Sequence, residues 1–404
     1  MAISQNEAYL LALPLLFGPA YLIWRLGRME YFAPLVVVQI ITGIALGPSV
    51  LGQWLPELQQ EVFNPGVLQM LHGLAMWAIM LFLWTAGVEL DIGEIWHQRR
   101  DSFVTAGFAL GVPLLIGAVV ASALLASPAW RGSQAAPWQF ALSIGMSCAV
   151  TALPILMLFL EKLDILQYPI GQRVLRYASL DDILIWVVLS VILLDVQLLQ
   201  RQLVFLLCFF LLSLLLRRLI RTTPSSDRWY LVLIWIPLCS FFADWAGYHY
   251  IVGAFLSGLV LDAKWFNPRE LALFRKHVML TIMPAFFLST GLRTQWSVDG
   301  IYVVGAGALL LLVSIYAKLA GVHLAARLLK WKQGEASLIG WLLQTKALIV
   351  ILFANVLLDK QIITASMFAA ILLMAVGSTV LAIPRATPAL AALAALTKPN
   401  VRTP

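Results

Sequence analysis

The sequence predicts an all-α polytopic membrane protein with about thirteen transmembrane helices, arranged as two inverted six-helix repeats with crossed, broken helices. Three observations predict this class: an apolar composition, many long apolar segments and a weak internal repeat. Of the 404 residues, 61% are hydrophobic and only 12% are charged, whereas soluble proteins average about 45–50% apolar and about 25% charged residues. This composition excludes a soluble globular enzyme and an intrinsically disordered chain.

The apolar segments set the number of helices. A helix needs about 20 predominantly apolar residues to cross the hydrocarbon core of a bilayer. Thirteen segments match this template, and the ninth is short enough to be tilted or re-entrant. They span residues 8–25, 33–51, 67–88, 102–126, 138–160, 169–194, 198–216, 228–247, 249–263, 277–293, 299–327, 335–358 and 361–384.

Lys and Arg residues indicate the orientation. They concentrate in the alternate loops on the side of the C-terminus, and the opposite loops hold only Arg131, Arg201, Arg293 and Lys360. Because cytoplasmic loops carry the excess of Lys and Arg, we expect the N-terminus outside and the C-terminus in the cytoplasm. The net charge of +7 reflects this anchoring, and the expected location is a bacterial inner or plasma membrane.

The two halves of the chain resemble one another weakly. Short motifs recur in the same order and map the second, third and fifth segments onto the ninth, tenth and twelfth. The first six segments then repeat as the last six in opposite orientation, with a linker helix at 198–216 between them. Inverted repeats of this kind are typical of transporters, whose substrate site lies near mid-membrane. The matching pairs are 41–46 with 251–256, 82–85 with 287–290, 144–145 with 339–340 and 152–153 with 347–348.

Two adjacent carboxylates, Asp181 and Asp182, lie near the middle of the sixth segment. Each costs roughly 2.5–3.5 kcal/mol at the centre of a membrane helix, so a pair without a purpose is not expected. Neighbouring helical residues point about 100° apart, so one carboxylate can face a water-filled cavity while the other faces a partner helix. The alternative is that both belong to a structural ion-pair network.

Lys318, deep within the eleventh segment, is the natural partner for these carboxylates. A lone ammonium at that depth is as costly as a lone carboxylate. The alternative is that Lys318 extends its side chain to the cytoplasmic edge, because Arg327 and Lys330 lie only two to three helical turns further on.

The fifth segment is interrupted at Pro154. Proline has no N–H and displaces the carbonyl of Val150, which therefore needs another partner. Ser143, Ser147 and Thr151 are spaced by four residues and form a hydroxyl stripe that leads to the break. Oxygen ligands beside a broken helix suit a hard monovalent cation.

The corresponding part of the twelfth segment is also polar at mid-span, with Gln344, Thr345 and Lys346 in succession. Together with the fifth segment it predicts a pair of crossed, broken helices. Lys346 would supply positive charge at the crossing and balance the dipoles of the helix ends. The sequence shows no nucleotide-binding loop, metal-ligand cluster or nucleophile elbow.

These residues resemble the monovalent cation:proton antiporter-2 family, in particular its sodium/proton exchanger-like membrane domains. The similarity covers essentially the whole chain, with the motifs in the right order. The matching motifs are 46–52, 81–91, 151–154, 181–182, 253–258 and 286–293.

The resemblance implies a homodimer in the lipid bilayer and a membrane domain over residues 1–384, followed by a short cytoplasmic tail over 385–404. It implies no nucleic-acid partner and, because the tail is short, no nucleotide-binding regulatory domain. No cofactor is expected beyond the transported ions. The implied dimerisation or scaffold half comprises 1–90 and 228–296, and the implied ion-binding core comprises 102–194 and 299–384.

By the same resemblance, Asp182 binds the monovalent cation and the proton, and Asp181 forms an ion pair with Lys318. Thr151 and Ser147 line the site at the break. The implied function is a secondary active antiporter that exchanges Na⁺, or alternatively Li⁺ or K⁺, for protons by alternating access. The Asp-Asp pair and the membrane lysine look like the electrogenic sodium/proton branch. Such a protein is not an enzyme and serves pH homeostasis.

Several alternatives remain open. Thr345 and Lys346 stand where many relatives have an Arg-Gly pair, which leaves the preferred ion in doubt. A K⁺/H⁺ antiporter or Kef-like potassium efflux system is therefore the main alternative, and a sodium-coupled organic solute transporter is a further one. An intramembrane aspartyl protease would need carboxylates from different helices that face one another, whereas Asp181 and Asp182 diverge from one turn.

Overall fold

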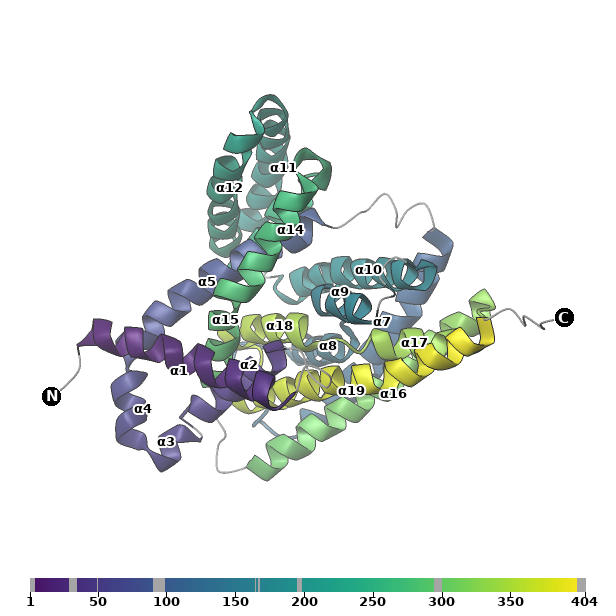
Figure 1. Cartoon of the computed structure of the whole chain (residues 1–404), viewed down its shortest axis with the longest axis horizontal. Helices are drawn as coiled ribbons and strands as arrows, with labels where there is room; N and C mark the ends of the chain where they lie inside the picture. Colours follow the sequence, from purple (N-terminus) through teal and green to yellow (C-terminus); the bar gives the residue numbers. More distant parts are fainter. Residues whose placement is uncertain are drawn as a thin grey trace. The chain divides into compact units, whose positions relative to one another are not determined.

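The computed structural model is almost entirely helical (Figure 1). It describes residues 4–28, 35–48, 50–89, 99–163, 165, 168–194, 198–293 and 300–397. Within these ranges, β pairing is limited to an isolated bridge between Arg131 and Ile363. The prediction of an all-α protein is therefore confirmed.

Each of the thirteen predicted spans coincides with one helix or with consecutive helices. In the first half these are α1 (Gln5–Leu26), α2 (Leu35–Leu46), α5 (Pro65–Val88), α7 (Arg99–Leu124), α8 (Pro137–Ala149), α9 (Leu153–Lys162) and α10 (Pro169–Ile192). In the second half they are α11 (Leu199–Thr222), α12 (Ser225–Trp245), α13 (Tyr250–Leu259), α14 (Pro268–His277), α15 (Met283–Leu292), α16 (Gly300–Leu329), α17 (Glu335–Leu342), α18 (Ala347–Asp359) and α19 (Ala365–Thr397). Short helices α3 (Leu51–Trp54), α4 (Pro56–Val62) and η3 (Ala263–Trp265) lie between them, and the π-helix η4 (Val278–Ile282) joins α14 to α15.

Eight helical stretches among the described residues are long and apolar enough to cross a membrane by themselves. A ninth candidate is the pair α17 and α18, which is bent by 45° at its break. The remaining predicted spans are interrupted, carry ionisable residues or are short, as α13 is with ten residues. The chain is a multi-pass integral membrane protein.

Three predicted ends differ from the structure by six residues or more. The tenth span begins at Pro268 instead of 277, because Asn267 caps α14 by accepting a hydrogen bond from the Arg269 N–H at 3.0 Å. The charged residues of α14 lower its mean hydropathy, so a search for apolar segments does not recognise the start of this helix. The seventh span extends to Thr222. The last helix continues to Thr397 through a segment predicted as a tail, because alanine has the highest helix propensity. Residues 398–404 of that tail lie outside the described part.

The chain divides into two compact units. The first comprises Met1–Leu22, Gln39–Asp91 and Trp186–Thr294, and the second comprises Ile23–Val38, Ile92–Ile185 and Gln295–Pro404. In the first unit, α5 packs against α13 and α15, and α13 packs against α12. In the second unit, α16 packs against α7 and α19, while α7 also packs against α8.

Glycine allows a close contact between α5 and α13 in the first unit. A Cβ on Gly258 of α13 would collide with the carbonyl oxygen of Trp84 in α5, and one on Gly87 would collide with the carbonyl of Phe255. Only a residue without a side chain permits backbones to approach this closely.

Candidate functional site

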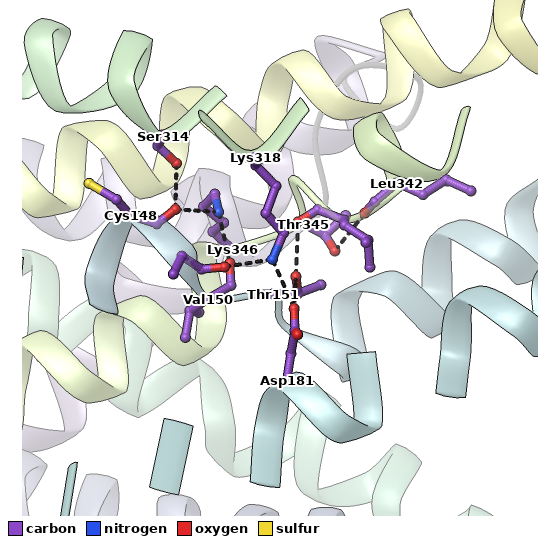
Figure 2. A network of polar contacts seen from close by, with 11 residues as sticks. Cys148, Val150, Thr151, Asp181, Ser314, Lys318, Leu342, Thr345 and Lys346 are labelled. Atoms are coloured by element: carbon purple, nitrogen blue, oxygen red, sulfur yellow. Dashed lines mark hydrogen bonds and ion pairs between the residues drawn. The ribbon is translucent and has the colours of Figure 1, made fainter. Parts of the chain in front are cut away.

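Two broken helices meet in the second unit. The first break, Val150 to Ala152, separates α8 from α9, and the second, Leu343 to Lys346, separates α17 from α18. The Ala152 N–H donates a hydrogen bond to the Thr345 carbonyl oxygen at 2.5 Å. The two interruptions predicted from the sequence therefore lie against one another, and Figure 2 shows the polar contacts around them.

The C-terminal end of α8 is closed by side chains from other helices. Lys318 Nζ donates to the Ala149 carbonyl at 2.6 Å, and Lys346 Nζ donates to the carbonyls of Cys148 and Val150, each at 2.8 Å. Ser314 Oγ also donates to the Cys148 carbonyl, at 3.0 Å. A helix end carries partial negative charge on its unpaired carbonyls, so two ammonium groups stabilise this end directly.

The N-terminal end of α18 is capped by a threonine from α19. The N–H groups of Lys346 and Ala347 lie 3.1 Å and 2.9 Å from Thr379 Oγ1 and donate to it. The Thr379 hydroxyl donates its own proton to the Ala375 carbonyl at 2.9 Å. This side chain replaces the helical partners that the first N–H groups of α18 lack.

The middle of α10 brings Asp181 to the crossing. Asp181 Oδ2 accepts a hydrogen bond from Lys318 Nζ at 2.8 Å and lies 2.9 Å from Thr151 Oγ1. Thr151 Oγ1 is also 3.0 Å from the Leu343 carbonyl oxygen. A hydroxyl has one proton, so Thr151 can donate to only one of these two acceptors at a time. The acceptor that Thr151 uses can therefore change when Asp181 binds a proton or a cation.

Asp182 differs from its neighbour. It is 3% exposed, and its Oδ1 has no hydrogen-bond partner among the described residues. Asp181 Oδ1 is likewise without a partner in the part of the chain that the structure describes. A buried carboxylate oxygen without a partner is costly, and a bound proton or a hard cation would remove that cost.

Most of the predicted site residues lie together at the crossing of the two broken helices. Thr151 and Lys318 both lie within hydrogen-bond distance of Asp181 Oδ2, and Lys346 binds the carbonyl of Val150. Thr345 contributes its carbonyl oxygen to the crossing, while its hydroxyl donates to the Leu342 carbonyl at 3.1 Å.

The remaining residues are placed differently. Ser147 Oγ donates to the Ser143 carbonyl of its own helix at 2.8 Å, so its proton is not directed to the carboxylates. Pro154 is the second residue of α9, and its side chain is outside the described part of the structure. Lys318 is fully buried, which places its ammonium in the interior instead of at the cytoplasmic edge.

Two hydroxyl residues of this site are absent from the sequence prediction, Ser314 and Thr379. Ser314 precedes Lys318 by four residues and therefore shares its helix face, a spacing that points to it once Lys318 is chosen. Thr379 is a lone hydroxyl in an apolar helix, and no sequence pattern separates it from other such residues.

The crossing gathers two carboxylates and two ammonium groups, all at most 3% exposed. Lys318 pairs with Asp181, whereas the Lys346 ammonium donates hydrogen bonds to backbone carbonyls. No group of three or more His, Cys, Asp or Glu side chains that could hold a metal ion occurs among the described residues.

Comparison with known proteins identifies the family. Residues 12–391 match the family described as sodium/hydrogen exchanger, transmembrane. The chain belongs to this sodium/hydrogen exchanger family. Its members are transporters.

Several curated proteins are similar to this chain in sequence. Cation/H(+) antiporter 19 of Arabidopsis thaliana is 28% identical over 94% of this chain. The chain spans 50% of the length of that relative. The Na(+)/H(+) antiporter NhaS4 of Synechocystis is 26% identical, with 87% of this chain and 90% of the relative covered.

A solved structure has the same fold. The sodium proton antiporter MjNhaP1 from Methanocaldococcus jannaschii superposes with a TM-score of 0.67 at 15% sequence identity, and the match covers 98% of this chain and 99% of the other chain. The chain therefore has the fold of that antiporter.

Proposed function

We propose that this chain is a secondary active antiporter that exchanges monovalent cations for protons by alternating access, with Na⁺ as the preferred cation. One observation carries the proposal: a buried carboxylate, Asp182, has an oxygen without a partner in the described part of the chain, beside an Asp181–Lys318 ion pair at the crossing of two broken helices. The similarity to a cation/H(+) antiporter from Arabidopsis and a Na(+)/H(+) antiporter from Synechocystis supports the substrate class.

Competition at one carboxylate couples the two fluxes. Asp182 holds either a proton or a cation, because two positive charges do not share one desolvated carboxylate. The ion-free form carries a bare buried charge, which costs several kcal/mol in a low-dielectric site. The ion-free form therefore changes slowly between its outward-open and inward-open states, and exchange of ions is faster than uncoupled leakage of either ion. No cofactor other than the transported ions takes part.

The neighbouring pair supports electrogenic exchange. When a single cation binds, Asp182 can release its proton. If the same cation also occupies Asp181, Lys318 loses its ion-pair partner and can release a second proton. Thr151 would follow the change by donating its proton to Asp181 or to the Leu343 carbonyl. More than one proton per monovalent cation moves net charge across the membrane.

The two compact units are candidates for the two moving parts. The second unit holds the complete crossing and would be the ion-binding core, and the first unit, which includes α1, α5 and α12 to α15, would be the scaffold of a homodimer. The excess of Lys and Arg in alternate loops supports an outside N-terminus and a cytoplasmic C-terminus in a bacterial membrane.

The test is cation-driven proton movement in proteoliposomes. Purified wild type is reconstituted into acid-loaded vesicles, and internal pH is followed after addition of Na⁺, Li⁺ or K⁺ with the membrane potential clamped or free. We expect alkalinisation by Na⁺ that is absent in Asp182→Asn. Its dependence on voltage reports the net charge moved.

The matched control is Asp244→Asn, which changes an exposed carboxylate on α12 and should exchange at the wild-type rate. If only K⁺ caused alkalinisation, K⁺ and not Na⁺ would be the preferred cation. If folded, correctly inserted wild type responded to none of the three cations, the antiport proposal would be wrong.

A further inference from the structure

A second buried polar cluster lies one helical turn from the ion site. Tyr177 precedes Asp181 by four residues on α10 and therefore shares its helix face. The Tyr177 hydroxyl donates a hydrogen bond to Asp101 Oδ2 of α7 at 2.5 Å. Tyr177 is fully buried, whereas Asp101 is partly exposed. This hydrogen bond therefore joins the interior of the second unit to its surface.

The part of α7 beside α10 carries two further buried hydroxyls. Ser102 and Thr105 are fully buried, and their hydroxyl oxygens have no hydrogen-bond partner among the described residues. Ala106 of α7 packs against Leu180 of α10. Because Ala106 directly follows Thr105 and Leu180 directly precedes Asp181, the Thr105 side chain lies at the level of the ion site.

These hydroxyls suit bound water. A buried polar group without a partner is costly, and a water molecule in a protein interior makes about 2–4 hydrogen bonds. Ser102, Thr105 and Tyr177 offer hydroxyl oxygens that both donate and accept. Water bound there would connect the Asp101–Tyr177 hydrogen bond with the level of Asp181.

The side chains packed against Tyr177 favour protons over cations on this route. The Tyr177 ring stacks on Trp331, with ring centroids 5.9 Å apart and planes at 6°. The Arg173 guanidinium lies 4.4 Å from the centre of the Trp331 ring and forms an ion pair with Glu335 at 3.1 Å. A cation would have to displace this stack and pass a guanidinium, whereas a proton moves along hydrogen bonds between atoms that stay in place.

We propose that Tyr177 and Asp101 carry protons between the ion site and the aqueous phase. Water held at the hydroxyls of Ser102 and Thr105 would complete the path on the side of the ion site. This inference deepens the proposed antiport and rests on it. The excess of Lys and Arg in alternate loops would make this the cytoplasmic end of α10.

The proton transfer returns every side chain to its starting form. A proton that leaves Asp182 binds to water, and the water passes a proton to the Tyr177 oxygen. At the same time the O–H bond of Tyr177 breaks, and its proton moves to Asp101 Oδ2. Asp101 then releases this proton to the aqueous phase. A Tyr177 hydroxyl that turns away from Asp101 interrupts the path, as coupled exchange requires while the ion site faces the other side of the membrane.

The experiment compares Na⁺-driven alkalinisation of acid-loaded proteoliposomes for wild type, Tyr177→Phe and Asp101→Asn. Tyr177→Phe keeps the ring on Trp331 and removes only the hydroxyl. We expect each variant to lower the maximal rate at least about tenfold, because a positioned proton-transfer group is lost. The KM for Na⁺ should stay within about twofold of wild type, because the ion site itself is unchanged.

Matched controls change the same groups elsewhere. Tyr230→Phe removes the hydroxyl of an exposed tyrosine on α12, and Asp244→Asn changes an exposed carboxylate on the same helix. Both should exchange at the wild-type rate.

Two further measurements separate proton transfer from a structural role. Asp101→Glu keeps the carboxylate and should retain most of the rate that Asp101→Asn loses. Replacing H₂O by D₂O should slow Tyr177→Phe by a larger factor than it slows wild type, because proton transfer then limits the cycle. A variant whose helices were merely displaced would keep the wild-type ratio of rates in H₂O and D₂O.

The proton path would be overturned if Tyr177→Phe exchanged at the wild-type rate, or if its lower rate came with the wild-type ratio of rates in H₂O and D₂O. Should Asp101→Asn not fold, Tyr177→Phe still decides. If wild type exchanged no cation, the antiport proposal and the proton path would both be wrong. An active wild type with equally active variants would overturn the proton path alone.

Discussion

The Nζ of Lys346 lies 2.8 Å from the carbonyl oxygen of Val150, the backbone group that Pro154 leaves without its helical partner. The same ammonium binds the Cys148 carbonyl. A residue in the break of one helix thus closes the end of the other. Together with Lys318 and Ser314, this side chain stabilises the C-terminal end of α8.

Replacing Lys346 by methionine should lower the free energy of unfolding by about 2 to 4 kcal/mol. The substitution keeps the length of the side chain but leaves two buried carbonyls with fewer partners, at about 1–3 kcal/mol for each unsatisfied group. Thermal unfolding of the purified protein in detergent measures the change. Lys332→Met, at an exposed position, is the matched control and should stay within about 0.5 kcal/mol of wild type. Equal shifts in the two variants would contradict the role of Lys346.

The Asp181–Lys318 pair should behave as one unit in a double-mutant cycle. Either Asp181→Asn or Lys318→Met alone leaves a buried charge or donor without its partner at 2.8 Å, which we expect to cost about 3–5 kcal/mol. The double variant removes both and should cost clearly less than the sum of the two. Unfolding in detergent gives the three differences. Additive costs would show that the pair contributes no coupling energy.

The crossing of α5 and α13 should tolerate no side chain at Gly258. A methyl group there would meet the Trp84 carbonyl, and the backbones would have to separate. We expect Gly258→Ala to reduce the yield of folded protein and to lower its thermal midpoint, whereas Gly305→Ala in α16 should be neutral or slightly stabilising. Gly305 has open space around its Cβ position, and alanine favours the helix by about 1 kcal/mol. Size-exclusion chromatography and thermal unfolding compare the two variants.

Glu89, directly after α5, should make stability depend on pH. Burial raises the pKa of this carboxyl above its ordinary value, and Arg275 Nη1 at 2.8 Å from Glu89 Oε2 offsets only part of the shift. The folded state therefore holds the proton to higher pH than the unfolded state does. The contribution of Glu89 is fully present below the unfolded pKa of about 4.3 and is lost as pH rises through the folded pKa.

Thermal unfolding of wild type and Glu89→Gln across this range measures the effect. The difference in stability between the two should move in favour of the variant as pH rises above the unfolded pKa and should level off above the folded one. A difference that did not change with pH would show that the pKa of Glu89 is the same in both states.

Much of the fold could be predicted from the sequence because the bilayer imposes a length and a polarity on each crossing segment. The thirteen apolar segments correspond to helices, and Pro154 marked the break that separates α8 from α9. The start of α14 was predicted incorrectly because its charged first turns hide a helix that Asn267 caps. The end of α19 was missed because Pro384 and Pro388 suggested an end, whereas the alanine-rich segment continues the helix.

By itself, the sequence determined that the chain crosses the membrane many times and that Asp181, Asp182, Lys318 and Lys346 lie at depths where a charge needs a partner. Those conclusions rest on the cost of charge in hydrocarbon, which depends only on position along a span. Only the tertiary structure decided which partners meet: Thr151 with Asp181, Lys346 with two carbonyls of α8, and Ser314 and Thr379 with the two helix ends. Hydrogen bonds form over about 3 Å, and which groups come that close is set by the packing of helices that are distant in sequence.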